Sequence, residues 1–226
     1  MTQEILYCSP AGIVLSSDSL VVRVREDGRR EHLAVRKLFP LGPGAALSTA
    51  GAFAGVRISE GFAARARAEG LSCLEELLPA AQVYFEAEYG RFIRENQSWF
   101  EAHPEAHRSL YVLLAGRADR AEGLAWGARF LASEEHRLPF QILPIGEVLT
   151  VPRRLGLEGQ LMSRLKGGSP LEDVAAFCHS ALGMLGEGEP EWVGRPFYTA
   201  ILDGQGFHWW QWDAESTGQA GRAEER

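Results

Sequence analysis

Thr2 is the first residue of the chain whose side chain can serve as a nucleophile. A threonine hydroxyl is a poor nucleophile unless a base lies beside it, and in one arrangement the base is the threonine's own α-amino group. That arrangement requires threonine to be the first residue of the mature chain. Met1 precedes Thr2, and a small second residue allows an aminopeptidase to remove the methionine. We therefore expect Thr2 to become N-terminal without cleavage of a propeptide.

Asp18 and Lys37 are the residues expected to support this nucleophile. Asp18 ends a strand that is expected to pair with the strand beginning at Thr2. A cation close to the α-amine lowers its pKa, ordinarily about 7.7–8.0, because it disfavours the charged form. Lys37 is one of only two lysines among 23 lysines and arginines, and lysine, unlike arginine, has a pKa that its surroundings can tune. A solvated surface lysine is the alternative interpretation.

The small-residue segment Ser48–Ala52 is expected to contribute backbone N–H groups to the site. Its pattern indicates a strand that ends at the start of a helix, and the first N–H groups of a helix have no partner within it. Such groups stabilise the oxyanion that forms when a carbonyl is attacked. We expect the Ala52 N–H to have this role. A closely packed turn is the alternative.

Short strands and pairs of helices alternate along the chain and must position these residues. Turn residues such as Ser9–Gly12 separate short apolar runs, as in antiparallel hairpins, and apolar residues at helical spacing follow. The predicted strands cover residues 5–8, 13–17, 20–24, 34–40, 45–49, 110–115, 123–130, 140–145, 197–202 and 207–212. The predicted helices cover 52–69, a stretch from 72 onward with a kink or a restart at Pro79, 155–165 and 170–185.

This order of elements predicts an α+β fold. Two antiparallel sheets packed face to face, with helix pairs outside, would bury such elements in one core. We expect a single domain over residues 1–213, because no linker-like change in composition divides the chain. The small and polar residues 214–226 predict a disordered tail.

The composition argues against several classes of partner. The net charge is −7 and no run of lysine or arginine stands out, so we expect no nucleic-acid binding. No apolar run approaches the roughly 20 residues that span a bilayer, and the N-terminus does not resemble a secretion signal. Cys8, Cys73 and Cys178 are odd in number and widely spaced, which predicts neither a disulfide framework nor a zinc site. We expect a cytoplasmic protein without a cofactor or a metal.

The N-terminal residues resemble the proteasome β-type subunits, a family of N-terminal-nucleophile hydrolases. Counted from Thr2, the chain matches the family pattern of a threonine, a glycine before an apolar strand, and two small residues followed by Asp-Ser. Within that family it most resembles the bacterial Anbu group, or proteasome-type peptidases, whose members typically begin Met-Thr. The matching segments are Thr2, Gly12–Leu15, Ser16–Ser19, Arg36–Phe39, Ser48–Ala52, Leu110–Gly116, Ile145–Glu147, Ser169–Asp173 and Val193–Pro196.

This resemblance implies a four-layer αββα sandwich that assembles into a homo-oligomeric ring or an open helical turn. It also implies a threonine-type peptidase or amidohydrolase that acts on peptides or unfolded proteins. In the implied mechanism Thr2 attacks the carbonyl and its amine accepts the proton. Lys37 then polarises the site, Asp18 orients Lys37, and the Ala52 N–H holds the oxyanion. No motif of the chain specifies an ATPase partner.

The chain departs from the family pattern in two places. The gap between Asp18 and Lys37 is longer than usual by a few residues, so Lys37 is matched by its sequence context. The family's late Asp-x-x-Ser or Asp-Ser-Thr element has no clear counterpart in residues 183–192, which contain Glu187, Glu189 and Glu191 but no serine. Two alternatives therefore stay open: a catalytically inactive, ring-forming scaffold of the same fold, and a hydrolase or transpeptidase for small amides.

Overall fold

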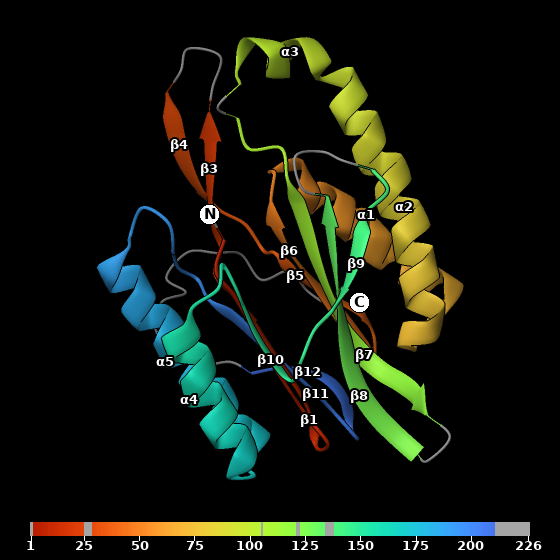
Figure 1. The fold of residues 1–226 in the computed structure, drawn as a ribbon, viewed down its shortest axis with the longest axis vertical. Helices are drawn as coiled ribbons and strands as arrows, with labels where there is room; N and C mark the ends of the chain where they lie inside the picture. Colours follow the sequence, from red (N-terminus) through yellow and green to blue (C-terminus); the bar gives the residue numbers. More distant parts are fainter. Residues whose placement is uncertain (1, 25–28, 105, 121–122, 134–137, 211–226) are drawn as a thin grey trace, which may run out of the picture.

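The fold, a computed structural model, combines helices with antiparallel sheets, as the sequence predicts (Figure 1). It describes residues 2–24, 29–104, 106–120, 123–133 and 138–210. The tail predicted over residues 214–226 lies outside the described residues. No helix among the described residues is both long and apolar enough to cross a membrane.

Hairpins from the two ends of the chain combine into one five-stranded antiparallel sheet. The turn Ser9–Gly12 folds the first strand back onto the second, with Leu6 opposite Leu15. A strand that the sequence did not predict, Val148–Val151, pairs with the outer edge of the first strand. Across this first sheet the strands are β10 (Val148–Val151), β1 (Glu4–Ser9), β2 (Gly12–Ser17), β11 (Tyr198–Asp203) and β12 (Gly206–Trp209).

The second five-stranded sheet is built from strands on both sides of the first helices. Its second strand pairs Leu47 with Phe39 on one side and with Leu114 on the other. The following hairpin has strands of 11 residues each, longer than the sequence predicts. Across this second sheet the strands are β5 (Leu38–Gly42), β6 (Ala45–Gly51), β7 (Leu110–Arg120), β8 (Gly123–Ser133) and β9 (Gln141–Pro144).

A two-stranded ribbon, β3 (Leu20–Val24) with β4 (Arg30–Ala34), projects away from the two sheets (Figure 1). The prediction of one strand over residues 34–40 is therefore wrong, because β4 ends at Ala34 and β5 begins at Leu38 in another sheet. The intervening residues carry the chain from the ribbon to the second sheet. The ribbon also accounts for the long gap between Asp18 and Lys37.

The helices form two pairs with a short additional turn. A single helix runs through Pro79, so the helix does not restart there. Proline removes one backbone hydrogen bond there, whereas Leu77, Ala81 and Phe85 of the same helix are completely buried. The helices are α1 (Ala54–Glu69), α2 (Leu74–Glu95), α3 (Gln97–Ala102), α4 (Leu155–Lys166) and α5 (Leu171–Gly188).

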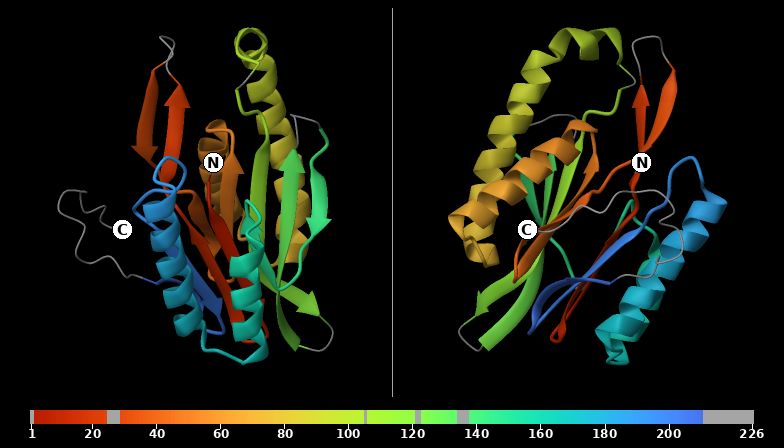
Figure 2. Two further views of the ribbon diagram at one scale, coloured as in Figure 1. Left: turned by 60° about the vertical axis from the view of Figure 1, so that its left-hand side comes forward. Right: turned by 180° about the vertical axis from the view of Figure 1, so that it is seen from behind.

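The buried side chains lie in three apolar layers between these elements. Ile5 and Tyr7 of β1 face α4 and α5, whereas Leu6 and Cys8 face the second sheet, as expected from the alternation of a strand. Phe62 and Phe85 lie in the third layer, between the second sheet and the pair α1–α2. Figure 2 shows the resulting order of helix pair, sheet, sheet and helix pair.

Candidate functional site

Asp18 directly follows β2 and is bonded to the beginning of the described chain. Its N–H donates to the Gln3 carbonyl oxygen at 3.1 Å, and the Gln3 N–H donates to Asp18 Oδ1 at 2.9 Å. The structure thus places Asp18 one residue from Thr2, at the same end of the hairpin. Pairing of the two short strands is the local reason, because their register continues to this point.

Lys37 reaches the same carboxylate from the segment between β4 and β5. Its Nζ lies 3.0 Å from Asp18 Oδ1 and 2.6 Å from the Leu20 carbonyl oxygen. The two side chains are 1% and 0% exposed, so the surface-lysine interpretation is wrong. Burial lowers the pKa of Lys37, and the adjacent Asp18 carboxylate opposes that shift. The result is a buried ion pair whose lysine has a tuned pKa.

The second oxygen of Asp18 is also fully engaged. Oδ2 accepts the Leu20 N–H at 3.0 Å and the Gly194 N–H at 3.3 Å. With the bonds to Gln3 and Lys37, the carboxylate accepts four hydrogen bonds. Gly194 is 176 residues away in the sequence, and its role was visible beforehand only as part of the matching segment Val193–Pro196. Such a carboxylate is fixed in orientation and holds the lysine in one place.

Thr2 lies two residues before the start of β1 and is 8% exposed. By strand alternation its side chain lies on the same face as Glu4 and Leu6, toward the second sheet. The N–H of the next residue, Gln3, and the ammonium of Lys37 share one oxygen of Asp18. Thr2 is therefore one residue along the chain from the hydrogen bonds that join Gln3 to Asp18 and Asp18 to Lys37.

The backbone N–H that was expected to hold an oxyanion, at the end of β6, already has a hydrogen-bond partner. The Ala52 N–H donates to the Ser109 carbonyl oxygen at 2.8 Å, so it is not available to an oxyanion, and that expectation is wrong. The Thr49 N–H donates to the Lys37 carbonyl oxygen at 3.0 Å, on the opposite side of the strand. Because N–H groups alternate sides along a strand, we expect the Gly51 N–H on the same side of β6 as the Thr49 N–H.

Gly51 can take this conformation because it has no side chain. Its φ is +98°, and a Cβ atom there would lie 2.1 Å from the Ser109 carbonyl oxygen. Any other residue would be strained and would displace the neighbouring backbone. The small-residue segment Ser48–Ala52 already indicated close packing in the sequence, but it did not show that the Ala52 N–H pairs with the Ser109 carbonyl oxygen.

Arg154 fastens the beginning of the chain to the end of α5. Its Nε donates to Gln3 Oε1 at 2.6 Å, and its two terminal nitrogens bind both oxygens of Glu189 at 2.8 and 2.6 Å. The Glu189 interaction raises the pKa of Arg154 and lowers that of Glu189. Glu189 belongs to the region where the family's late Asp/Ser element was sought, and sequence reasoning missed its partner because the two are distant in the chain.

Glu4 is a further titratable group beside the ion pair. It is completely buried, and neither of its carboxylate oxygens has a hydrogen-bond partner among the residues that the structure describes. Burial raises its pKa to about 8; nearby Ser48 and Lys37 act in the opposite direction. No hydrogen bond of ordinary length joins the Ser48 hydroxyl to Glu4. At neutral pH Glu4 is therefore mainly a neutral carboxylic acid.

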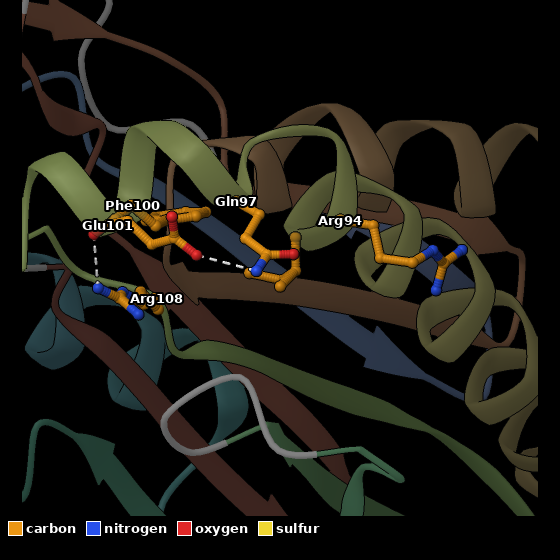
Figure 3. A pocket seen from close by; sticks show the side chains of 6 residues that line it. Arg94, Gln97, Phe100, Glu101 and Arg108 are labelled. Carbon is orange, nitrogen blue, oxygen red and sulfur yellow. Dashed lines mark hydrogen bonds between the residues drawn. The ribbon is translucent and has the colours of Figure 1, made fainter.

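A separate pocket of about 360 Å³ lies at the corner between α2 and α3 (Figure 3). Its polar groups bind one another: Gln97 donates to Glu101 at 2.9 Å, and Arg108 donates to the Phe100 carbonyl oxygen at 2.8 Å. Arg94 points away from them along α2. None of the predicted site residues lines this pocket. The described part of the chain also contains no group of three or more His, Cys, Asp or Glu side chains that could hold a metal ion.

Comparisons with known proteins do not identify a relative of this chain. No protein-family model matches the sequence, and no curated protein was found to be similar to it. Functional inference therefore rests on the buried site and on the sequence resemblance.

Proposed function

We propose that this chain is an N-terminal-nucleophile hydrolase in which Thr2 attacks an amide carbonyl. Within that class, the sequence resemblance favours a proteasome-type peptidase similar to the Anbu group. The observation that carries the proposal is the shared oxygen of Asp18, which accepts hydrogen bonds from both the Gln3 N–H and Lys37 Nζ. The residue that follows the nucleophile is thereby tied to a buried, oriented ammonium.

In the proposed reaction Thr2 Oγ forms a bond to the carbonyl carbon, and its proton passes to the Thr2 α-amine. The positive charge of Lys37 favours the neutral amine and stabilises the oxygen as it loses its proton. The Gly51 N–H stabilises the oxyanion. The leaving amine departs with the proton from the Thr2 ammonium, and an ester remains. Water then attacks the ester and gives a proton to the same amine; as the bond to Thr2 Oγ breaks, the ammonium returns that proton to Oγ and the acid is released.

Contacts from late in the chain support this proposal where the family's Asp/Ser element is missing. The Gly194 N–H binds Asp18 Oδ2, and Arg154 binds Gln3 while it is held by Glu189. Both contacts act on residues next to Thr2. We propose that they fix the nucleophile and its supporting pair in this protein.

The proposal is tested by mass spectrometry and by covalent labelling. Intact mass shows whether Met1 is removed, which the reaction requires because the amine must be free. An electrophile that reacts with N-terminal threonine, such as a peptide epoxyketone, should label Thr2 in the wild type and fail to label Thr2→Ala. Lys37→Met should keep Thr2 but label at least tenfold more slowly, on the basis of the usual contribution of such groups. A chain that retains Met1 and is not labelled would refute the proposal.

A non-catalytic, ring-forming scaffold is the second candidate, and the burial of the site favours it. Thr2 is only 8% exposed, and the Asp18 carboxylate braces β2, β3 and the segment at Gly194 as a structural ion pair would. This candidate predicts oligomers that form equally well with Thr2→Ala and no labelling of the wild type. Light scattering coupled to gel filtration, performed alongside the labelling, distinguishes the two.

A further inference from the structure

Glu4 is the one member of the buried charged group near Thr2 that the proposed reaction does not use. It is 0% exposed, like Asp18, and Lys37 is 1% exposed. A charged carboxylate in the interior is normally paired or hydrogen-bonded. Both oxygens of Glu4 lack a partner among the described residues, whereas Asp18 accepts four hydrogen bonds. The surroundings of Asp18 therefore stabilise a negative charge, whereas those of Glu4 favour a protonated, neutral carboxyl group.

The position of Glu4 on β1 directs it at the site. Alternation places Glu4 on the face of Leu6, which packs in the layer between the two sheets. Ser48 faces the same layer from β6, next to Ala46, and is also fully buried without a hydrogen-bond partner within the described residues. Thr2 lies two residues before Glu4 and shares its face. Glu4 thus shares a strand face with the residue two positions before it, Thr2, and lies near the uncharged Ser48 hydroxyl.

Few charges are available to compensate an ionised Glu4. The charged groups that act on it are Lys37, which favours ionisation, and Asp18, which opposes it. Its strand neighbours are Ser17 on β2 and Val151 on β10, and neither titrates near neutral pH. Because Lys37 already neutralises Asp18, an ionised Glu4 leaves the buried group with a net negative charge.

We infer that Glu4 is a positioning residue of the nucleophile site: its neutral carboxyl leaves Asp18 as the single anion facing Lys37, and its ionisation slows attack by Thr2. The inference rests on the proposed function of Thr2. An added anion beside Thr2 favours the protonated amine, which cannot act as base, and opposes negative charge on Oγ. Burial raises the pKa of Glu4 to about 8, so this change falls at the upper limit of physiological pH.

The test compares the rate at which the epoxyketone labels Thr2 in the wild type and in Glu4→Gln across the alkaline range. If only the neutral form of Glu4 supports attack, one pH unit above its midpoint the wild-type rate falls about tenfold, while Glu4→Gln keeps most of its rate. Glu4→Asp, which restores a carboxyl, should regain the alkaline fall. Deprotonation of Lys37 lowers the labelling rate of the wild type and of every Glu4 variant, so their rates are compared at the same pH. Equal alkaline falls in wild type and Glu4→Gln, or a slower Glu4→Gln, overturn the inference.

Two further measurements separate failure of the inference from failure of the proposed function. The infrared carbonyl band of a protonated carboxylic acid should be present in the wild type at neutral pH and absent from Glu4→Gln, whether or not Thr2 reacts. Glu4→Met serves as the second variant without a carboxyl if Glu4→Gln folds poorly. Absence of labelling at every pH refutes the function of Thr2 and the dependent role of Glu4. Normal labelling without the infrared band refutes only the inference.

Discussion

The buried pair of Asp18 and Lys37 should respond unequally to removal of its two members. Asp18→Asn removes the negative charge and half of the acceptor capacity that serves Gln3, Leu20 and Lys37. Each buried donor without an acceptor costs about 1–3 kcal/mol, and stranding one member of a buried ion pair costs about 3–5 kcal/mol. We expect Asp18→Asn to lower the free energy of unfolding by about 4 kcal/mol or more.

Lys37→Met should be milder, because the carboxylate keeps three backbone N–H donors. The main losses are the bond from Lys37 Nζ to the Leu20 carbonyl oxygen and the attraction to Asp18. We expect a loss of about 2 kcal/mol. In the double variant the lysine is no longer stranded, so the combined loss should be smaller than the sum of the single losses.

Urea denaturation followed by tryptophan fluorescence measures all three variants. The protein concentration is held constant and then changed once, because assembly contributes to apparent stability. Arg65→Met is the matched control: Arg65 bonds Glu69 at 2.7 Å, but both side chains are about half exposed, at 52% and 44%. Such a pair contributes only about 0.3–0.5 kcal/mol. A Lys37→Met variant as unstable as Asp18→Asn would refute the view that Asp18 is the centre of this network.

Three further predictions concern the surroundings of the site. Gly51→Ala should cost about 2 kcal/mol or more and slow labelling of Thr2, because its Cβ would meet the Ser109 carbonyl oxygen at 2.1 Å; Gly159→Ala, with no neighbouring atom within 4 Å, should raise the melting temperature or leave it unchanged. Arg154→Met should accelerate amide hydrogen exchange at the start of β1 and cost about 1 kcal/mol, since its bond to Gln3 and its ion pair are partly exposed. The pKa of buried Glu158 is lowered by Arg153 and Thr150 against the effect of desolvation, so its contribution is present above its unfolded pKa and is lost as pH falls through its folded pKa. Unfolding measured between about pH 5 and 3 should therefore show a steeper loss in the wild type than in Glu158→Gln, and equal slopes would contradict this.

The sequence predicts local elements well where turn chemistry and periodicity agree. The strands around the turn Ser9–Gly12 and the helix that ends at Gly70 are found within one or two residues of their predicted bounds. The strand predicted over 34–40 is wrong because Ala34–Pro40 is uniformly compatible with a strand. Only long-range pairing decides that Leu38 joins β6 and that Ala34 joins β3. The short strand Val148–Val151 was missed because its partner, β1, begins more than 140 residues earlier.

The candidate site was likewise predicted from the sequence only in part. Residue types and sequence context were enough to predict that Lys37 lies beside Asp18, and the structure pairs them at 3.0 Å. They did not reveal that the Ala52 N–H is bonded to the Ser109 carbonyl oxygen, since the direction of an N–H depends on strand pairing and on backbone dihedrals. The contacts of Gly194 and Arg154 depend on pairing across most of the chain, which periodicity does not report.

The base of the ribbon β3–β4 is hydrogen-bonded to both members of the buried ion pair, Asp18 and Lys37. Leu20, its first residue, donates its N–H to Asp18 and accepts a hydrogen bond from Lys37 through its carbonyl oxygen, and the returning chain bonds Val35 N–H to Ser19. An isolated two-stranded ribbon is marginally stable in water, so its attachment to the body depends on these bonds. Displacement of Leu20 relative to Asp18 would therefore stretch the hydrogen bonds that hold the Lys37 ammonium.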